Sequence, residues 1–253
     1  MNPHPLYLPG KACPAYQLRY VWTGWPHDVG LCNLSDDLLR EIKPLWDNDG
    51  LRLLEHHATT NSIQLLFSAK PDVSPVFLAA RAKGRLDHAL RIRGLPIEFS
   101  RKFALRAIGD TTAADIEAYI AKQVTKEHFV DSRFASTLQP YTHSFADVDA
   151  NQSIEATRGR YWYNLHIVLV HAERFRICDR DRIQLTHDRC IAIAAKKAHQ
   201  LAAISVMPDH LHLSLIGDVK LSPETIVLAY QNNLAYALGQ ALASLSRAVK
   251  QTR

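Results

Sequence analysis

Two histidines separated by one residue, His210 and His212, are the side chains whose type and spacing most directly suggest chemistry. They lie in the largely apolar run Met207–Leu213, which predicts a β-strand. Side chains two residues apart on a strand point to the same face, so both imidazoles can converge on one divalent ion while Leu211 points into the core. Because the chain has 13 histidines, the spacing alone also fits two ordinary surface or core histidines.

A tyrosine and a glutamine four residues apart form a second candidate pair, in the other half of the chain. We expect a helix over residues 112–124, capped by Thr111 or Thr112. Tyr119 and Gln123 would then share one face of that helix. A phenol has a pKa of about 10, so it becomes a useful nucleophile only where a metal ion offsets the developing charge. An amphipathic helix with a tyrosine at its edge would show the same spacing.

The sequence contains an internal repeat. A shift of 148 residues aligns residues 61–65 with residues 209–213, and Ser74 with Ser222, without a gap. Both serines precede a proline, which predicts an N-cap followed by proline in the first helical turn. In the first copy the two histidine positions hold Ser62 and Gln64, so we expect the first half to bind no catalytic metal.

Each half shows a β-α-β-α pattern of apolar and β-branched segments. Strands are expected at 16–23, 63–68, 161–170 and 204–216, and helices at 38–46 and 186–199. We therefore predict an α+β fold with helices on one face of each sheet. The expected division is a first lobe over 1–135, a polar linker over 136–157 and a second lobe over 158–253. One continuous α+β domain with coincidental similarity is the alternative.

The run Met207–Leu213 resembles the HUH motif of the small single-tyrosine transposases, which include the insertion-sequence-200 type and relatives associated with repetitive extragenic palindromes. The resemblance covers most of the chain, in two copies. It implies ferredoxin-like or RRM-like transposase lobes that form a pseudo-dimer, with His210 and His212 binding Mg²⁺ or Mn²⁺. It also implies that Tyr119 cuts single-stranded DNA, leaving a 5′-phosphotyrosine and a free 3′-hydroxyl, while Gln123 completes the metal shell.

The pieces of such a site are split between the two halves. Tyr119 and Gln123 belong to the first, and His210 and His212 to the second. The family works as homodimers in which one subunit's tyrosine helix can dock against the other subunit's histidine pair. We therefore expect a tandem fusion with one composite site, able to act as a monomer. A chain cut short before a second tyrosine helix is another interpretation.

The charge distribution favours a nucleic-acid partner. The net charge is +5, a mild preference for polyanions, and basic residues crowd one stretch after the degenerate motif. The resemblance assigns that stretch to a helix that meets DNA. The expected DNA-binding residues are Lys83, Arg85, Arg91, Arg93, Arg101 and Lys102.

The expected partner is single-stranded or hairpin DNA, met in the cytoplasm. No apolar run approaches the length that spans a membrane. The main alternative function is a domesticated protein that binds structured DNA without cleaving it, because one of the two motifs has decayed.

Overall fold

The computed structural model describes residues 5–10, 18–27, 34–95, 97–127, 129 and 132–251. Tyr16, the expected start of the first strand, lies outside them. The first half contains β1 (Leu18–Pro26), α1 (Asp36–Asn48), β2 (Leu51–Ala58), β3 (Ile63–Ala69), α2 (Pro75–Ile92) and β4 (Phe99–Ile108). Next come α3 (Ala113–Ala121), α4 (Gln123–Lys126), α5 (Ser132–Leu138), η1 (Gln139–Tyr141), β5 (Thr142–Ser144) and β6 (Ile154–Glu155). The remainder contains β7 (Gly159–Trp162), β8 (Asn164–Val170), η2 (Ala172–Arg174), α6 (Arg180–Lys196), β9 (Gln200–Val206), β10 (His210–Ile216) and α7 (Pro223–Gln251).

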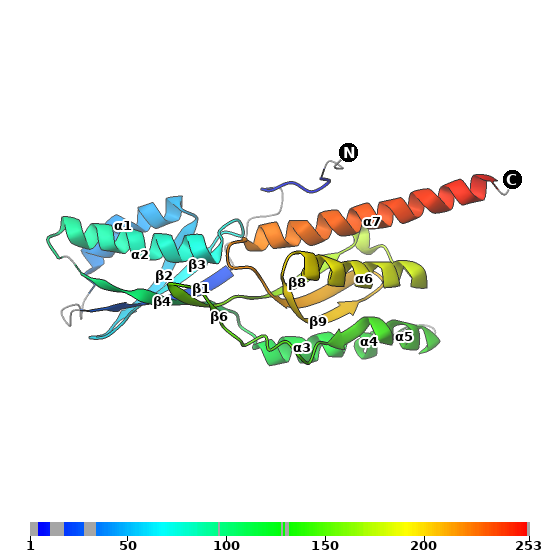
Figure 1. Ribbon diagram of the computed structural model, residues 1–253, viewed down its shortest axis with the longest axis horizontal. Helices are drawn as coiled ribbons and strands as arrows, with labels where there is room; N and C mark the ends of the chain where they lie inside the picture. The colour runs from blue at the N-terminus through cyan, green and yellow to red at the C-terminus, as the bar shows by residue number, and fades with distance from the viewer. Residues whose placement is uncertain are drawn as a thin grey trace.

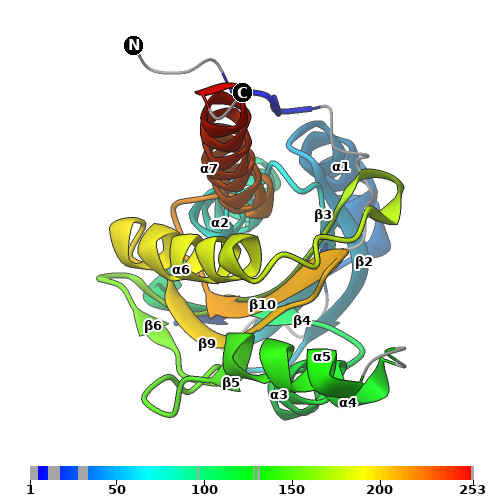
Figure 2. The same ribbon diagram turned by 90° about the vertical axis from the view of Figure 1, so that its right-hand side faces the viewer.

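These strands form two sheets. A six-stranded sheet has the order β2-β3-β1-β4-β7-β6, and a four-stranded sheet has the order β5-β9-β10-β8. All recorded pairings are antiparallel except that of β4 with β7, which is parallel. The helices α1, α2, α6 and α7 lie on one side of the sheets, and α3 to α5 lie on the other (Figures 1 and 2). The predicted α+β fold with antiparallel sheets is confirmed.

The four-stranded sheet differs from the expectation because helices cover both of its faces. Helix α3 follows β4 of the six-stranded sheet, yet it packs against β5, β9 and β10 of the four-stranded one. The buried side chains Ala113 and Ile120 attach it there. Segment 136–157, expected to be a polar linker, contributes β5 to one sheet and β6 to the other.

The internal repeat extends to an irregularity in the backbone. The register of β2 against β3 shifts between Leu53 and Glu55, which leaves Leu54 unpaired in the ladder. In the second sheet the register of β9 against β10 shifts so that Ala202 is passed over. The shift of 148 residues that aligns the two sequences carries Leu54 onto Ala202. Each half therefore places a β-bulge at the same point of the same strand.

The helix starts follow the expected capping pattern. The hydroxyl of Ser74 accepts from the amide of Phe77 at 3.3 Å, and that of Thr112 accepts from the amide of Asp115 at 3.1 Å. Ser222 accepts from Thr225 at 3.2 Å, just before Pro223 opens α7. None of the described helices is long and apolar enough to cross a membrane.

Several element boundaries differ from those expected from sequence. The segment 204–216 is a hairpin, because the turn at residues 207–209 separates β9 from β10. The helix expected over 112–124 breaks at Lys122 into α3 and α4. The strands β2 and β4 were not expected, since their polar side chains obscure the alternation on which such a prediction depends.

Candidate active site

The structure brings Tyr119 next to the histidine pair. The ring centroid of Tyr119 lies 5.4 Å from that of His212 and 6.2 Å from that of His166. The rings of His210 and His212 are 4.9 Å apart on the same face of β10. This meeting of side chains from the two halves follows from the packing of α3 against β9 and β10. Tyr119 remains 42% exposed, so a ligand can reach it from solvent.

Each histidine is held through its Nδ1 atom. His210 Nδ1 lies 2.6 Å from Asp209 Oδ1, and His212 Nδ1 lies 3.1 Å from His166 Nε2. Both Nε2 atoms are therefore left for another partner. His212 Nε2 is buried and has no hydrogen-bond partner among the residues that the structure describes. Metal-binding histidines are typically oriented through their other ring nitrogen, so this arrangement fits a pair of metal ligands.

The electrostatics of the site favour a neutral His212. Burial, followed by the neighbouring His210 and His166, lowers the pKa of His212 to about 4. The imidazole is then neutral at pH 7, which is the form that binds metals. Burial would raise the pKa of Asp209, but the hydrogen bond and charge of His210, with Arg174, outweigh it and lower that pKa. Asp209 is thus an ionised partner for His210.

Gln123 is the remaining ligand expected from the resemblance. It begins α4, one turn beyond Tyr119, and is only 5% exposed. Its Nε2 donates to the Tyr119 carbonyl oxygen at 3.1 Å, which leaves the amide oxygen as its ligand atom. Among the described residues, no three His, Cys, Asp or Glu side chains are grouped to hold a metal. A site here would therefore combine the two histidines with an amide oxygen, the kind of oxygen donor that Mg²⁺ and Mn²⁺ accept.

Three neighbours of the site were not expected from sequence. His166 and Asp209 hold the two imidazoles, and Lys126 places its Nζ 4.2 Å from the Tyr119 ring centroid. Asp209 directly precedes the motif and could have been included. His166 depends on the register of β8 against β10, where it lies opposite Ser214, and Lys126 on the helix break at Lys122. The spacing of residues along the sequence therefore indicates neither His166 nor Lys126 as part of the site.

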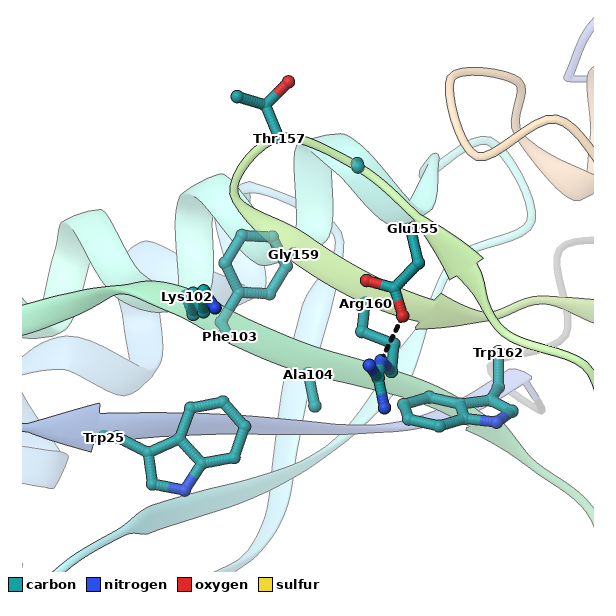
Figure 3. A pocket seen from close by; sticks show the side chains of 10 residues that line it. Trp25, Lys102, Phe103, Ala104, Glu155, Thr157, Gly159, Arg160 and Trp162 are labelled. Atoms are coloured by element: carbon teal, nitrogen blue, oxygen red, sulfur yellow. Dashed lines mark ion pairs between the residues drawn. The ribbon is translucent and has the colours of Figure 1, made fainter.

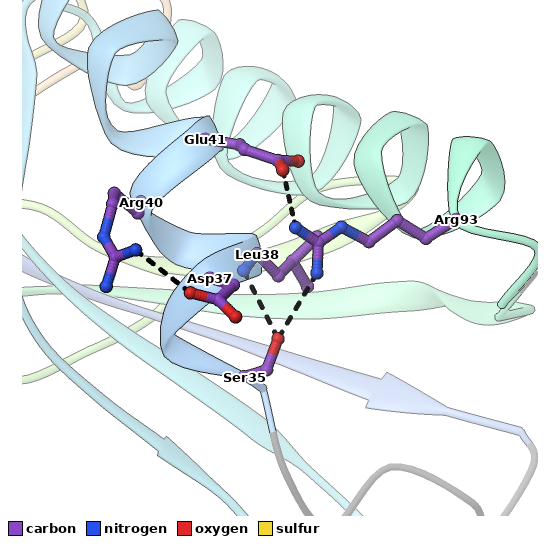
Figure 4. Close-up of polar contacts among 6 residues, drawn as sticks. All are labelled: Ser35, Asp37, Leu38, Arg40, Glu41 and Arg93. Atoms are coloured by element: carbon purple, nitrogen blue, oxygen red, sulfur yellow. Dashed lines mark hydrogen bonds and ion pairs between the residues drawn. The ribbon is translucent and has the colours of Figure 1, made fainter.

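The basic residues expected to contact DNA do not form one surface. Three lie on α2 and have partners within the chain: Lys83 donates to the Ser100 carbonyl, Arg85 pairs with Asp49 and Arg91 pairs with Asp87. Arg93, the C-cap of α2, pairs with Glu41. Figure 4 shows Arg93 between Glu41 and Ser35, on the helix side of the sheet. Arg101 and Lys102 are exposed on β4, and consecutive strand residues point to opposite faces.

One family model matches the segment of the chain that carries the two histidines. Residues 160–252 match the model of the family described as "Transposase IS200 like". The matched segment is just over a third of the chain; it contains His210 and His212 but not Tyr119. This match confirms the expected family resemblance for that segment.

A solved structure described as a candidate transposase from Deinococcus radiodurans R1 is also similar. It shares 18% identity with this chain, at a TM-score of 0.33. The match covers 46% of this chain and 98% of that one. A search of the curated proteins found no match.

Proposed function

We propose that this protein is a transposase-like enzyme that cleaves and transfers single-stranded DNA through a 5′-phosphotyrosine on Tyr119, acting on hairpin or repeat DNA. The observation that carries the proposal is the contact between an exposed tyrosine and a buried histidine pair. The Tyr119 ring is 5.4 Å from His212, whose Nε2 has no partner in the described part of the chain. The family match over residues 160–252 supports the same reaction class.

The chemistry is a transesterification at phosphorus. The Tyr119 hydroxyl oxygen gives up its proton to solvent, attacks the phosphorus of a DNA phosphodiester and forms a phosphotyrosine ester. The bond from phosphorus to the 3′-oxygen breaks, and that oxygen takes up a proton to become a free 3′-hydroxyl. Strand transfer reverses the step, because another 3′-hydroxyl attacks the phosphotyrosine. Bond energies are similar on the two sides, so the exchange needs no external energy source.

The residues that would hold the metal are His210 and His212 through Nε2 and Gln123 through its amide oxygen. A bound Mg²⁺ or Mn²⁺ polarises the scissile phosphate and offsets the charge that develops on it. Lys126, over the Tyr119 ring, adds a positive charge where the phosphate would approach. Asp209 and His166 keep the two imidazoles in one orientation.

We further propose that the chain is a tandem fusion of two transposase-like units. The matching bulges at Leu54 and Ala202 support a common origin of the two halves. So does the helix that follows the motif strand, which begins at Pro75 in one half and at Pro223 in the other. Helix α3 then serves as the tyrosine helix of the first unit docked on the sheet of the second. The site is composite within one chain.

The test is incubation with end-labelled hairpin oligonucleotides and Mn²⁺, followed by a denaturing gel. The wild type should yield both a shortened strand and a slower protein–DNA adduct. Tyr119→Phe should yield neither, because the ring stays and only the nucleophilic oxygen is lost. His212→Ala should reduce cleavage at least about a hundredfold, as expected when a charge-stabilising group is removed. Cleavage by Tyr119→Phe at the wild-type rate would contradict the proposal.

The alternative is a protein that binds structured DNA without cutting it. The presence of Ser62 and Gln64 where the repeat would place a second histidine pair favours this function, because the loss of one of two ancestral sites would leave this pattern. Such a protein would shift the hairpin in a native gel, with an affinity that falls steeply with salt, and give no adduct. Both functions predict a shift in the native gel, but only the cleaving enzyme gives a shortened strand and an adduct in the denaturing gel.

A further inference from the structure

The six-stranded sheet has one face that no helix packs over in the described part of the chain. Helices α1 and α2 cover the opposite face, and α3 to α5 lie beneath the four-stranded sheet instead (Figures 1 and 2). We call this surface the open face, and it is the face that carries Gln64, the counterpart of His212 in the repeat. Its central side chains are Val21, Trp25, Lys102, Arg106, Arg160 and Trp162.

The strand register places three of these side chains side by side in one row across the sheet. Val21 pairs with Arg106, and Arg106 pairs in turn with Trp162, so the three share a face. The guanidinium carbon of Arg106 lies 4.2 Å from the Trp162 ring centroid, and that of Arg160 lies 6.0 Å from it. A guanidinium group and an indole ring each present a flat surface on which a base can stack.

A cavity of about 350 Å³ opens beside this row. Figure 3 shows the rings of Trp25 and Trp162 on either side of the Arg160 guanidinium, with Lys102 on the neighbouring strand. Trp25 is 38% exposed, although a large apolar ring is usually buried. Glu155 pairs with Arg160 and is the acidic side chain that lines the cavity. The charge of the lining is therefore net positive.

We infer that the open face binds single-stranded DNA by stacking bases on Trp25 and Trp162 while Lys102, Arg106 and Arg160 contact phosphates. Aromatic rings interleaved with cations on an exposed sheet are the combination that single-stranded nucleic acid requires, because its bases are unpaired and its backbone is anionic. The bases of a duplex are stacked and paired, so a duplex would gain only the attraction between its phosphates and the cationic side chains. A protein partner would have to cover the cations of Lys102, Arg106 and Arg160, and the cores of protein interfaces are depleted of charged residues.

This inference deepens the proposed function, on which it rests, by assigning a path to the substrate. The open face and α3 lie on the same side of the molecule (Figure 1). Strand β4, which carries Lys102 and Arg106, continues through residues 109–112 into α3, which carries Tyr119. A strand bound along β4 is thus directed toward the tyrosine. The basic side chains Arg85 and Arg91 of α2, and Arg93 at its C-cap, lie on the opposite side of the sheet and pair within the chain.

Tryptophan fluorescence tests the inference directly. The chain has four tryptophans, and Trp22 and Trp46 are fully buried under the helices. Emission from Trp25 and Trp162 should therefore be quenched when Tyr119→Phe protein binds an oligothymidylate of about 16 nucleotides. The quenching should disappear in the Trp25→Phe/Trp162→Phe double variant. Binding without any change in emission would overturn the inference.

Fluorescence anisotropy of labelled oligothymidylate supplies the affinity. Trp162→Ala should weaken binding about tenfold or more, because a stacking platform is lost. Arg106→Gln and Lys102→Gln should each lower the slope of log affinity against log salt by about 0.7, because each removes one phosphate contact. Arg91→Gln, on the helix side, is the matched control and should bind as the parent does. A larger loss in Arg91→Gln than in Arg106→Gln, or equal affinity for the corresponding duplex, would overturn the inference.

The two proposals fail in different ways. Wild-type protein that binds through the open face but never forms an adduct would contradict the proposed function and leave the binding surface standing. A Trp25→Ala/Trp162→Ala variant that forms the adduct and binds DNA with wild-type affinity would contradict the binding surface and leave the proposed function standing.

Discussion

Asp209 decides which nitrogen of His210 is available to a ligand. Its Oδ1 atom lies 2.6 Å from His210 Nδ1, while Arg174 holds its Oδ2 atom at 3.2 Å. An ionised carboxylate in this position favours the tautomer with a proton on Nδ1, so Nε2 faces outward with its lone pair. The residue directly before the motif therefore sets the orientation of His210.

Asp209→Ala should weaken Mn²⁺ binding by about ten- to a hundredfold, the usual cost of losing such an orienting carboxylate. Isothermal titration calorimetry measures this without relying on activity. Asp188→Ala is the matched control, since Asp188 makes a similar 2.9 Å contact with His187 at a different place. Equal affinities in the two variants would show that Asp209 does not position a ligand.

The sequence was informative at this scale where spacing is local. The histidine pair, the caps at Ser74 and Thr112, and the Tyr119–Gln123 spacing all depend on neighbours along the chain. His166 could not be predicted in the same way, because its contact with His212 depends on how β8 pairs with β10.

The residue that follows β10, Gly217, is packed between Tyr163, which precedes β8, and helix α7. Gly217 donates its amide to the Tyr163 carbonyl at 3.0 Å, just before β8. A Cβ atom at this position would lie 2.7 Å from Ile226 Cδ1 of α7 and 2.8 Å from Tyr163 Cε1. Both neighbours are almost completely buried, so neither can move away cheaply. The glycine lets the strand that carries the histidines approach α7 closely.

Gly217→Ala should lower the free energy of unfolding by about 1–3 kcal/mol, the range for overpacking a filled core. Gly84→Ala is the matched control, because a Cβ at that helical position meets nothing within 4 Å. It should stabilise the protein by about 0.5–1 kcal/mol through helix propensity. Urea unfolding measures both, and a destabilisation of the same size in the two variants would contradict the packing argument.

Element types were easier to predict than element partners. The helices α1, α2, α6 and α7 follow from apolar periodicity and from Ser-Pro starts. The parallel pairing of β4 with β7 joins residues more than fifty positions apart, and nothing in either strand indicates its partner. The crossing of α3 to the other sheet was suggested only by the division of candidate ligands between the halves.

The two halves form one molecule through these two connections. Strands β7 and β6, from the region after the first half, extend the six-stranded sheet, while α3 and β5 complete the other. The candidate site takes Tyr119 from one half and His212 from the other within a single chain. The proposed function therefore predicts that one polypeptide is catalytically complete.

Mixing Tyr119→Phe protein with His212→Ala protein should restore no cleavage. Each variant lacks one half of the composite site formed by Tyr119 and His212, and neither can supply the missing group to the other. Recovery of activity on mixing, measured on the labelled hairpin at several protein concentrations, would instead show that Tyr119 of one chain works with His212 of another.

Identification of the tyrosine in the covalent adduct tests the central claim most directly. Wild-type protein would be incubated with a hairpin oligonucleotide and Mn²⁺, and the adduct digested and mapped by tandem mass spectrometry. The account predicts a nucleotide attached through its 5′-phosphate to Tyr119, at no other tyrosine. An adduct at Tyr230, Tyr236 or any other tyrosine, or a complete absence of adduct with an intact fold, would contradict it.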